Sequence, residues 1–138
     1  MLEANQSIFK KSNGVDDFSH ILVVDDDSRI RSLLSRFLIS EGYRVSVASN
    51  VNDAEEAMND LIFDLIILDV MMPGDMDGID LARWIASHRP DLPVVLTSGY
   101  ILGPERLQGL RVQFVRKPFV IRSLTDAFVK ALKSATPG

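Results

Sequence analysis

The chain has 138 residues, of which 15 are basic and 19 acidic, so its formal net charge is −4. This length suits one domain with a buried core, and the acidic balance argues against a nucleic-acid-binding module, which usually carries a basic face. The absence of cysteine excludes disulfides and thiol chemistry, and two histidines are too few for a histidine-rich metal site.

Five short runs rich in apolar and β-branched residues predict β-strands. In chain order they cover residues 21–25, 44–48, 65–69, 94–98 and 112–115. The first, third and fourth runs are almost continuously apolar, which is typical of strands buried on both faces of a sheet. The second run alternates apolar and polar residues, which predicts an edge strand.

Apolar residues with the helical period predict a helix after each of the first three strands and another after the fifth. Asp27 and Asn50 are suitable N-caps for the first two helices. The expected inward residues are Ile30, Leu33, Leu34, Phe37 and Leu38, then Ala54, Ala57, Met58 and Leu61, then Ile79, Ala82, Trp84 and Ile85, and finally Leu124, Ala127, Phe128, Ala131 and Leu132. Between the fourth and fifth strands only residues 105–110 are candidates for a helix, because Gly103 and Pro104 interrupt the pattern.

Strands that alternate with helices predict an α/β domain, with a parallel sheet covered by helices on both faces. Five strands suit the flavodoxin-like order 2-1-3-4-5, whose ligand crevice lies at the carboxyl ends of the first and third strands. We expect this domain over residues 20–133, after an N-terminal arm over 1–19 that is loose or docks as a short helix, and before a frayed tail over 134–138. Because no apolar run approaches the roughly 20 residues that span a bilayer and no signal-peptide pattern is present, we expect a cytoplasmic protein without membrane contact.

Carboxylates follow the two strands that border the predicted crevice. Asp25, Asp26 and Asp27 end the first strand, and Asp69 ends the third. Like charges this close raise each other's pKa unless a cation offsets them, and Mg²⁺ or Mn²⁺ suits a site of carboxylates, waters and phosphate. Helix capping alone would explain one of these aspartates but not three.

A hydroxyl and an ammonium group are expected at the same edge of the sheet. Thr97 and Ser98 end the fourth strand, and Lys117 follows the fifth. Together with the carboxylates, this set matches phosphoryl transfer to an aspartate, in which a metal ion, a cation and a hydroxyl hold the phosphoryl oxygens.

These motifs, in this order and spacing, resemble the receiver domain of response regulators in two-component signalling, over about residues 20–133. The resemblance rests on residues 21–27, 65–74, 76–78, 93–100 and 117–119. It implies a CheY-like variant of the fold described above. It also implies that the chain is not an enzyme beyond catalysing its own phosphorylation and dephosphorylation.

The resemblance assigns roles around the metal. Asp69 corresponds to the phospho-acceptor and Asp26 to a direct Mg²⁺ ligand, whereas Asp25 acts through a metal-bound water. The backbone carbonyl of Met71 is the third protein ligand in this comparison. Lys117 is expected to pair with Asp69 and later with the phosphoryl oxygens.

It also assigns the residues that respond to phosphorylation. Ser98, five residues after Pro93, takes the position of the switch hydroxyl in preference to Thr97, and Phe114 takes that of the aromatic switch. The peptide bond before Pro118 is expected to be cis.

The implied partner is a histidine kinase or a histidine phosphotransfer protein that donates a phosphoryl group to Asp69. The side formed by the fourth helix, the fifth strand and the fifth helix is then read by a downstream protein or by a second copy. No output domain is recognisable after residue 133, so we expect no direct contact with nucleic acid. The chain is then a stand-alone receiver or part of a larger protein.

Three departures from the commonest family pattern are present. Residues 73–78 hold one extra residue, and the 19-position interval from Ser98 to Lys117 is short, as in receivers of hybrid histidine kinases, which predicts a short or mobile fourth helix. Met71 and Tyr100 offer no acid or amide beside the attacking water, which predicts slow self-dephosphorylation.

Three alternative functions remain compatible with the sequence. One is a haloacid-dehalogenase-like phosphatase with Asp25 as nucleophile and Asp27 as acid and base, although only Asp126 follows Lys117 where that family needs an acidic pair. Another is a flavodoxin-like module for a flavin or nucleotide, which the three clustered carboxylates disfavour. The third is a degenerate receiver that acts only as a binding module.

Overall fold

Five parallel strands form one sheet in the order β2-β1-β3-β4-β5, as the sequence predicts. The computed structural model of the chain describes residues 19–135, and side chains over residues 19–132. The strands are β1 (His20–Val24), β2 (Arg44–Ala48), β3 (Leu65–Asp69), β4 (Val94–Ser98) and β5 (Gln113–Arg116). The predicted bounds are correct for β2, β3 and β4, whereas β1 lies one residue earlier than predicted and β5 one residue later.

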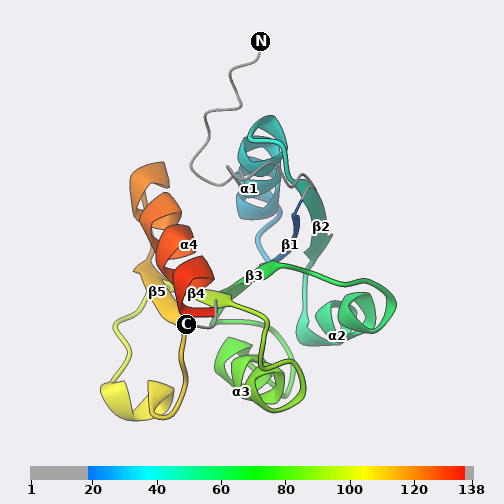
Figure 1. Cartoon of the computed structure of the whole chain (residues 1–138). Coiled ribbons are helices and arrows are strands. Elements are labelled where there is room, and N and C mark those ends of the chain that lie inside the picture. The colour runs from blue at the N-terminus through cyan, green and yellow to red at the C-terminus, as the bar shows by residue number, and fades with distance from the viewer. Residues whose placement is uncertain (1–18, 136–138) are drawn as a thin grey trace.

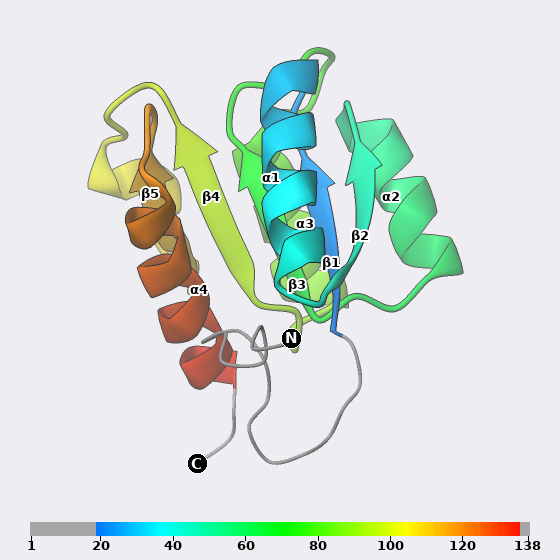
Figure 2. The same ribbon diagram turned by 90° about the horizontal axis from the view of Figure 1, so that it is seen from above.

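Helices cover both faces of this sheet. They are α1 (Ser28–Ser40), α2 (Val51–Asp60), α3 (Gly78–His88) and α4 (Ile121–Ala135). Figure 1 shows α1 and α4 on one face and α2 and α3 on the other, and Figure 2 shows α1 and α4 in front of the parallel strands. The two predicted N-caps are confirmed, because Asp27 accepts a hydrogen bond from the Arg29 backbone N–H and Asn50 accepts one from Asp53.

Successive residues of the inner strands point to opposite faces and build two cores. In β1, Leu22 and Val24 pack beneath α2 and α3, whereas Ile21 and Val23 pack beneath α1 and α4. Every residue of β1, β3 and β4 is buried, while β2 is a half-exposed edge strand. The alternation therefore explains why continuous apolar runs mark the inner strands.

Two of the predicted inward residues are exposed. Leu33 is 46% exposed, because the buried face of α1 is centred on Leu34 and Leu38 and Leu33 lies beside that face. Leu61 is 45% exposed, because α2 ends at Asp60 and the chain continues there in an extended conformation.

The segment between β4 and β5, where residues 105–110 are the candidate for a short helix, contains a short 3₁₀ helix, η2 (Pro104–Leu107), and no α-helix. Gly109, which follows η2 in this segment, has a φ of +83°, a backbone conformation that favours glycine. Arg83 of α3 donates hydrogen bonds to the carbonyl oxygens of Arg106 (2.7 Å) and Gln108 (3.0 Å). Arg106 in turn forms an ion pair with Asp77, the N-cap of α3, at 2.9 Å. The segment is thus fastened to α3 although it lacks a full helix.

The predicted arm over 1–19 and the predicted tail over 134–138 lie outside the described residues, except residue 19 and the end of α4, and they stay predictions. None of the helices in the described part of the chain has the length and apolar character that crossing a membrane requires.

Candidate functional site

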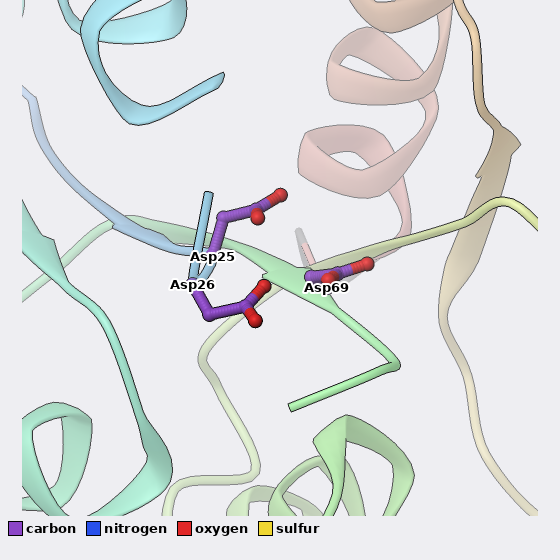
Figure 3. Close-up of side chains that lie close together, drawn as sticks. All are labelled: Asp25, Asp26 and Asp69. Atoms are coloured by element: carbon purple, nitrogen blue, oxygen red, sulfur yellow. The ribbon is translucent and has the colours of Figure 1, made fainter. Parts of the chain in front are cut away.

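Three carboxylates converge at the carboxyl ends of the neighbouring strands β1 and β3. Strands β1 and β3 are neighbours, so Asp25 and Asp26, which follow β1, lie beside Asp69, which ends β3 (Figure 3). One carboxylate oxygen from each of these residues lies within 4.8 Å of the other two. Asp25 and Asp69 are buried and Asp26 is exposed, so two carboxylates of the cluster lie inside the protein and the third is open to solvent.

The turn from β1 into α1 is held by its own backbone and by α1. The Asp25 N–H donates to the carbonyl of Ala48 (3.1 Å), and Asp25 Oδ1 accepts from the Asp27 N–H (2.9 Å). Arg31 Nη1 donates to the Asp25 carbonyl oxygen at 2.8 Å. These contacts hold Asp25 in place while Asp26, the next residue, points toward Asp69 (Figure 3).

Lys117 supplies the positive charge of the site. It follows β5, and its Nζ lies 2.8 Å from Asp25 Oδ2 and 3.3 Å from Asp69 Oδ1. Burial lowers the pKa of the Lys117 ammonium, but its hydrogen bonds and ion pairs with the two carboxylates outweigh burial and leave that pKa raised. The Lys117–Pro118 peptide bond is cis, as the family resemblance implies.

The carboxyl of Asp69 has a strongly raised pKa. Burial, followed by the charge of Asp25, raises the pKa of the Asp69 carboxyl to about 6, although Lys117 lowers it. Three carboxylates and one ammonium leave an excess of negative charge, and oxygen donors of this kind fit Mg²⁺. Both oxygens of Asp25 already accept hydrogen bonds, and its role as a ligand through a metal-bound water stays a prediction.

The loop after β3 is closed against the backbone of Asp69. The Gly78 N–H donates to the Val70 carbonyl at 2.8 Å. A Cβ atom at Gly78 would collide with the Asp69 carbonyl oxygen and lie 2.8 Å from Val70 Cα. Glycine at this position therefore lets α3 begin directly beside the backbone of Asp69. The Met71 side chain in this loop is 52% exposed, and the metal-binding role of its carbonyl stays a prediction.

Both candidate hydroxyls are buried at the end of β4. Ser98 Oγ accepts a hydrogen bond from the Tyr100 N–H at 3.0 Å, and the Ser98 carbonyl accepts one from the Lys117 N–H at 2.7 Å. Register pairs Thr97 with Asp69, so these two lie on one face of the sheet, while Ser98 shares the opposite face with Phe114. The register therefore does not decide between the two hydroxyls, and the choice of Ser98 stays a prediction.

Phe114 is half-buried on β5. It packs against the core beneath α2 and α3, together with Leu107 and Leu110 of the segment that contains η2. Phe114 is therefore a core residue at the edge of the sheet, and its role as a switch stays a prediction.

Sequence reasoning missed the arginines that fasten the site and its surroundings. Arg31 contacts Asp25, while Arg83 and Arg106 connect the η2 segment to α3. Only the place of Arg31 in the first turn of the helix after the aspartates could have indicated its contact. Arg83 and Arg106 have no comparable signal, because their partners lie 23 to 29 positions away in the sequence.

The phosphatase alternative does not fit this geometry. Both carboxylate oxygens of Asp25 already accept hydrogen bonds, one from the Asp27 N–H and one from Lys117, which does not suit a nucleophile. Asp27 caps α1 and pairs with Arg29 at 3.3 Å, so it is engaged away from a catalytic role as acid and base.

Comparisons with known proteins converge on one family. The family model described as response regulator receiver domain matches residues 21–129. Protein PetR of Rhodobacter capsulatus is 39% identical over 108 residues, which are 76% of this chain and 45% of PetR. The transcriptional regulatory protein GltR of Pseudomonas aeruginosa is 38% identical over 117 residues, 81% of this chain and 48% of GltR. The chain thus spans about half the length of these curated relatives.

A solved structure agrees. The response regulator protein TrrA from Thermotoga maritima, in complex with Mg²⁺ and BeF, matches with a TM-score of 0.75 and 32% identity. The match covers 83% of this chain and 100% of that chain.

Proposed function

Because this chain belongs to the response regulator receiver domain family, we propose that it accepts a phosphoryl group on Asp69 in a Mg²⁺-dependent reaction. Receiver domains are signalling modules, and the proposal includes no catalysis beyond this chain's own phosphorylation and dephosphorylation. The observation that carries it is the cluster of Asp25, Asp26 and Asp69 within 4.8 Å, with Lys117 in contact with Asp25 and Asp69.

Asp69 is suited to act as the nucleophile. With a pKa of about 6, its carboxyl is mostly ionised at neutral pH and yet remains buried among the groups that hold it. One carboxylate oxygen forms the new P–O bond. The P–N bond of a phosphohistidine donor breaks, and its electron pair stays on the imidazole nitrogen.

Lys117 and the carboxylates control the charge of the reaction. Lys117 holds Asp69 before transfer and is in place to pair with the phosphoryl oxygens after it. Asp26, Asp25 through water, and the Met71 carbonyl would hold Mg²⁺. The bound ion would neutralise negative charge on the phosphoryl oxygens. The similar protein TrrA was solved in complex with Mg²⁺ and BeF, which supports a Mg²⁺ site in this chain.

The donor in this proposal is a histidine kinase or a histidine phosphotransfer protein, and the location is the cytoplasm. Ser98 leaves Tyr100 and joins the phosphoryl oxygens, and Phe114 follows. The surface formed by η2, β5 and α4 is then read by a downstream protein or by a second copy. Phe114 and Leu107 both pack against the core beneath α2 and α3, which supports such coupling, because a shift of Phe114 must be accommodated by the residues that share this core.

The experiment is phosphorylation by acetyl phosphate with Mg²⁺, followed by intact-mass and peptide mass spectrometry. We expect one phosphoryl group on Asp69 in the wild type and none on Asp69→Asn or after chelation with EDTA. Asp60→Asn, which removes an exposed carboxylate at the end of α2, is the matched control and should react like the wild type. A phosphoryl group on Asp25, or full modification of Asp69→Asn, would contradict the proposal.

A further inference from the structure

Arg31 is a half-buried basic residue in the first turn of α1 with no role in the proposal above. Its Nη1 atom donates a hydrogen bond to the backbone carbonyl oxygen of Asp25, at 2.8 Å and six positions back in the sequence. A guanidinium remains charged at every physiological pH, so this is a permanent charge-assisted hydrogen bond.

The contacted carbonyl belongs to the peptide that joins the two acidic residues of the turn. Asp25 is held at its N–H by Ala48, at its two carboxylate oxygens by Asp27 and Lys117, and at its carbonyl by Arg31. The orientation of the peptide plane between Asp25 and Asp26 therefore depends on Arg31.

Asp26 has no comparable support for its side chain. Among the described residues, its exposed carboxylate has no hydrogen bond or ion pair, although it lies within 4.8 Å of Asp25 and Asp69. A carboxylate without side-chain partners takes its direction from the backbone that carries it. Arg31 thus acts on Asp26 through the peptide that precedes it.

We propose that Arg31 is a positioning residue for the metal site, which orients Asp26 toward Asp69 by fixing the Asp25–Asp26 peptide. The inference deepens the proposed function and rests on it for the identity of the ion. Groups that orient a metal ligand from outside the coordination sphere typically change metal affinity about 10- to 100-fold when removed.

A purely electrostatic role for Arg31 predicts the opposite sign. Its positive charge lies at the backbone of Asp25, one of the three aspartates, and it would repel a divalent cation. Removing that charge alone would tighten Mg²⁺ binding, whereas losing the orientation of Asp26 would weaken it. The direction of the change in Mg²⁺ affinity therefore separates the two roles.

The test is a titration of each protein with MgCl₂, followed by backbone amide shifts in two-dimensional NMR spectra. Arg31→Ala is compared with Arg36→Ala, which removes the same charge from an exposed position of α1. We expect the Mg²⁺ dissociation constant to rise about tenfold in Arg31→Ala, the lower end for such orienting groups, and to stay within about twofold in Arg36→Ala, whose exposed charge is screened by solvent. Arg31→Lys, which keeps a donor and the charge, should recover part of the affinity.

Acetyl phosphate then distinguishes positioning from general damage. If Arg31 acts only through the metal ligand, saturating Mg²⁺ should restore phosphorylation of Arg31→Ala to within about threefold of the wild type, because excess ion offsets weaker binding. Unchanged or tighter Mg²⁺ binding in Arg31→Ala would overturn the inference. If Arg31→Ala does not fold, Arg31→Met, which keeps a long side chain but has no donor, takes its place, and an unaltered or smaller dissociation constant in that variant would overturn the inference equally.

Failure of the proposed function has a different signature. In that case the wild type itself would carry no phosphoryl group on Asp69, whereas the Mg²⁺ titration, which uses no phosphodonor, would still report on Arg31.

Discussion

Replacement of Asp69 by asparagine should stabilise the metal-free protein, and the gain should grow with pH. Asp69 is only 4% exposed, and burial together with the charge of Asp25 raises its pKa to about 6. At neutral pH the folded protein therefore holds an ionised carboxylate that would be better solvated in the unfolded chain. Asparagine has nearly the same shape without the charge, so the substitution removes this cost while it also removes the ion pair with Lys117.

The sign and size follow from the two pKa values of Asp69. Its carboxyl has an ordinary pKa of 3.8 and a folded pKa of about 6, so between these values the unfolded state binds fewer protons than the folded state. The contribution of protonated Asp69 is fully present below pH 3.8 and is lost as the pH rises through about 6. Relative to low pH, the raised pKa of Asp69 therefore destabilises the folded state by about 1 kcal/mol at about pH 4.5, where mainly the unfolded chain is ionised, and by about 3 kcal/mol at about pH 8.

The assay is urea unfolding in EDTA at these two pH values, followed by the fluorescence of the single tryptophan, Trp84, on α3. Asp69→Asn should exceed the wild type in free energy of unfolding by about 2 kcal/mol more at the higher pH than at the lower. Asp60→Asn, at an exposed position, should show no such difference. Equal free energies for Asp69→Asn and the wild type at both pH values, or a gain that shrinks as pH rises, would refute the reasoning.

Four further outcomes are expected. Mg²⁺ at 100 times its dissociation constant should stabilise the wild type by about 2.7 kcal/mol in thermal unfolding, and Asp26→Asn should lose most of this gain; equal gains would exclude Asp26 as a ligand. Arg106→Ala should speed amide hydrogen exchange across residues 103–110 but lower the global free energy of unfolding by less than about 1 kcal/mol, since its ion pair with Asp77 is partly exposed; unchanged exchange would show that the ion pair does not hold the segment. Phe128→Ala, at a fully buried position of α4, should cost about 3–5 kcal/mol in urea unfolding, and a loss below about 1 kcal/mol would contradict its place in the core. The phosphorylated protein, followed by mass spectrometry with Mg²⁺ at neutral pH, should keep its phosphoryl group well beyond seconds, because the exposed Met71 side chain offers no acid or amide to a water; loss within seconds would exclude slow self-dephosphorylation.

Local patterns predicted most of the secondary structure, because periodicity reports which face of an element is buried. Continuous apolar runs identified the three inner strands, and Asp27 and Asn50 marked the starts of two helices. The same patterns failed at Leu33 and Leu61, where the width of the buried face and the end of a helix depend on neighbouring elements. They left the conformation of 105–110 open, because Gly103 and Pro104 interrupt the pattern, and the structure has a short 3₁₀ helix over Pro104–Leu107 there.

The sequence by itself determined the chemistry at the carboxyl edge of the sheet. Parallel strands bring their carboxyl ends to one edge, so the aspartates after the first and third strands had to meet once the order of the sheet was known. The motifs around Asp69 and Lys117 were sufficient to indicate the family, and the family model confirmed it.

Only the tertiary structure decided how the charges are paired. Lys117 was expected to contact Asp69, yet its shorter contact, at 2.8 Å, is with Asp25. The hydrogen bonds from Arg83 to the η2 segment were likewise not predictable, and only the place of Arg31 in the first turn of α1 could have indicated its hydrogen bond to the Asp25 carbonyl. Each of these contacts depends on the reach of a long side chain to a backbone or carboxylate oxygen on another segment, and periodicity along the chain carries no information about that reach.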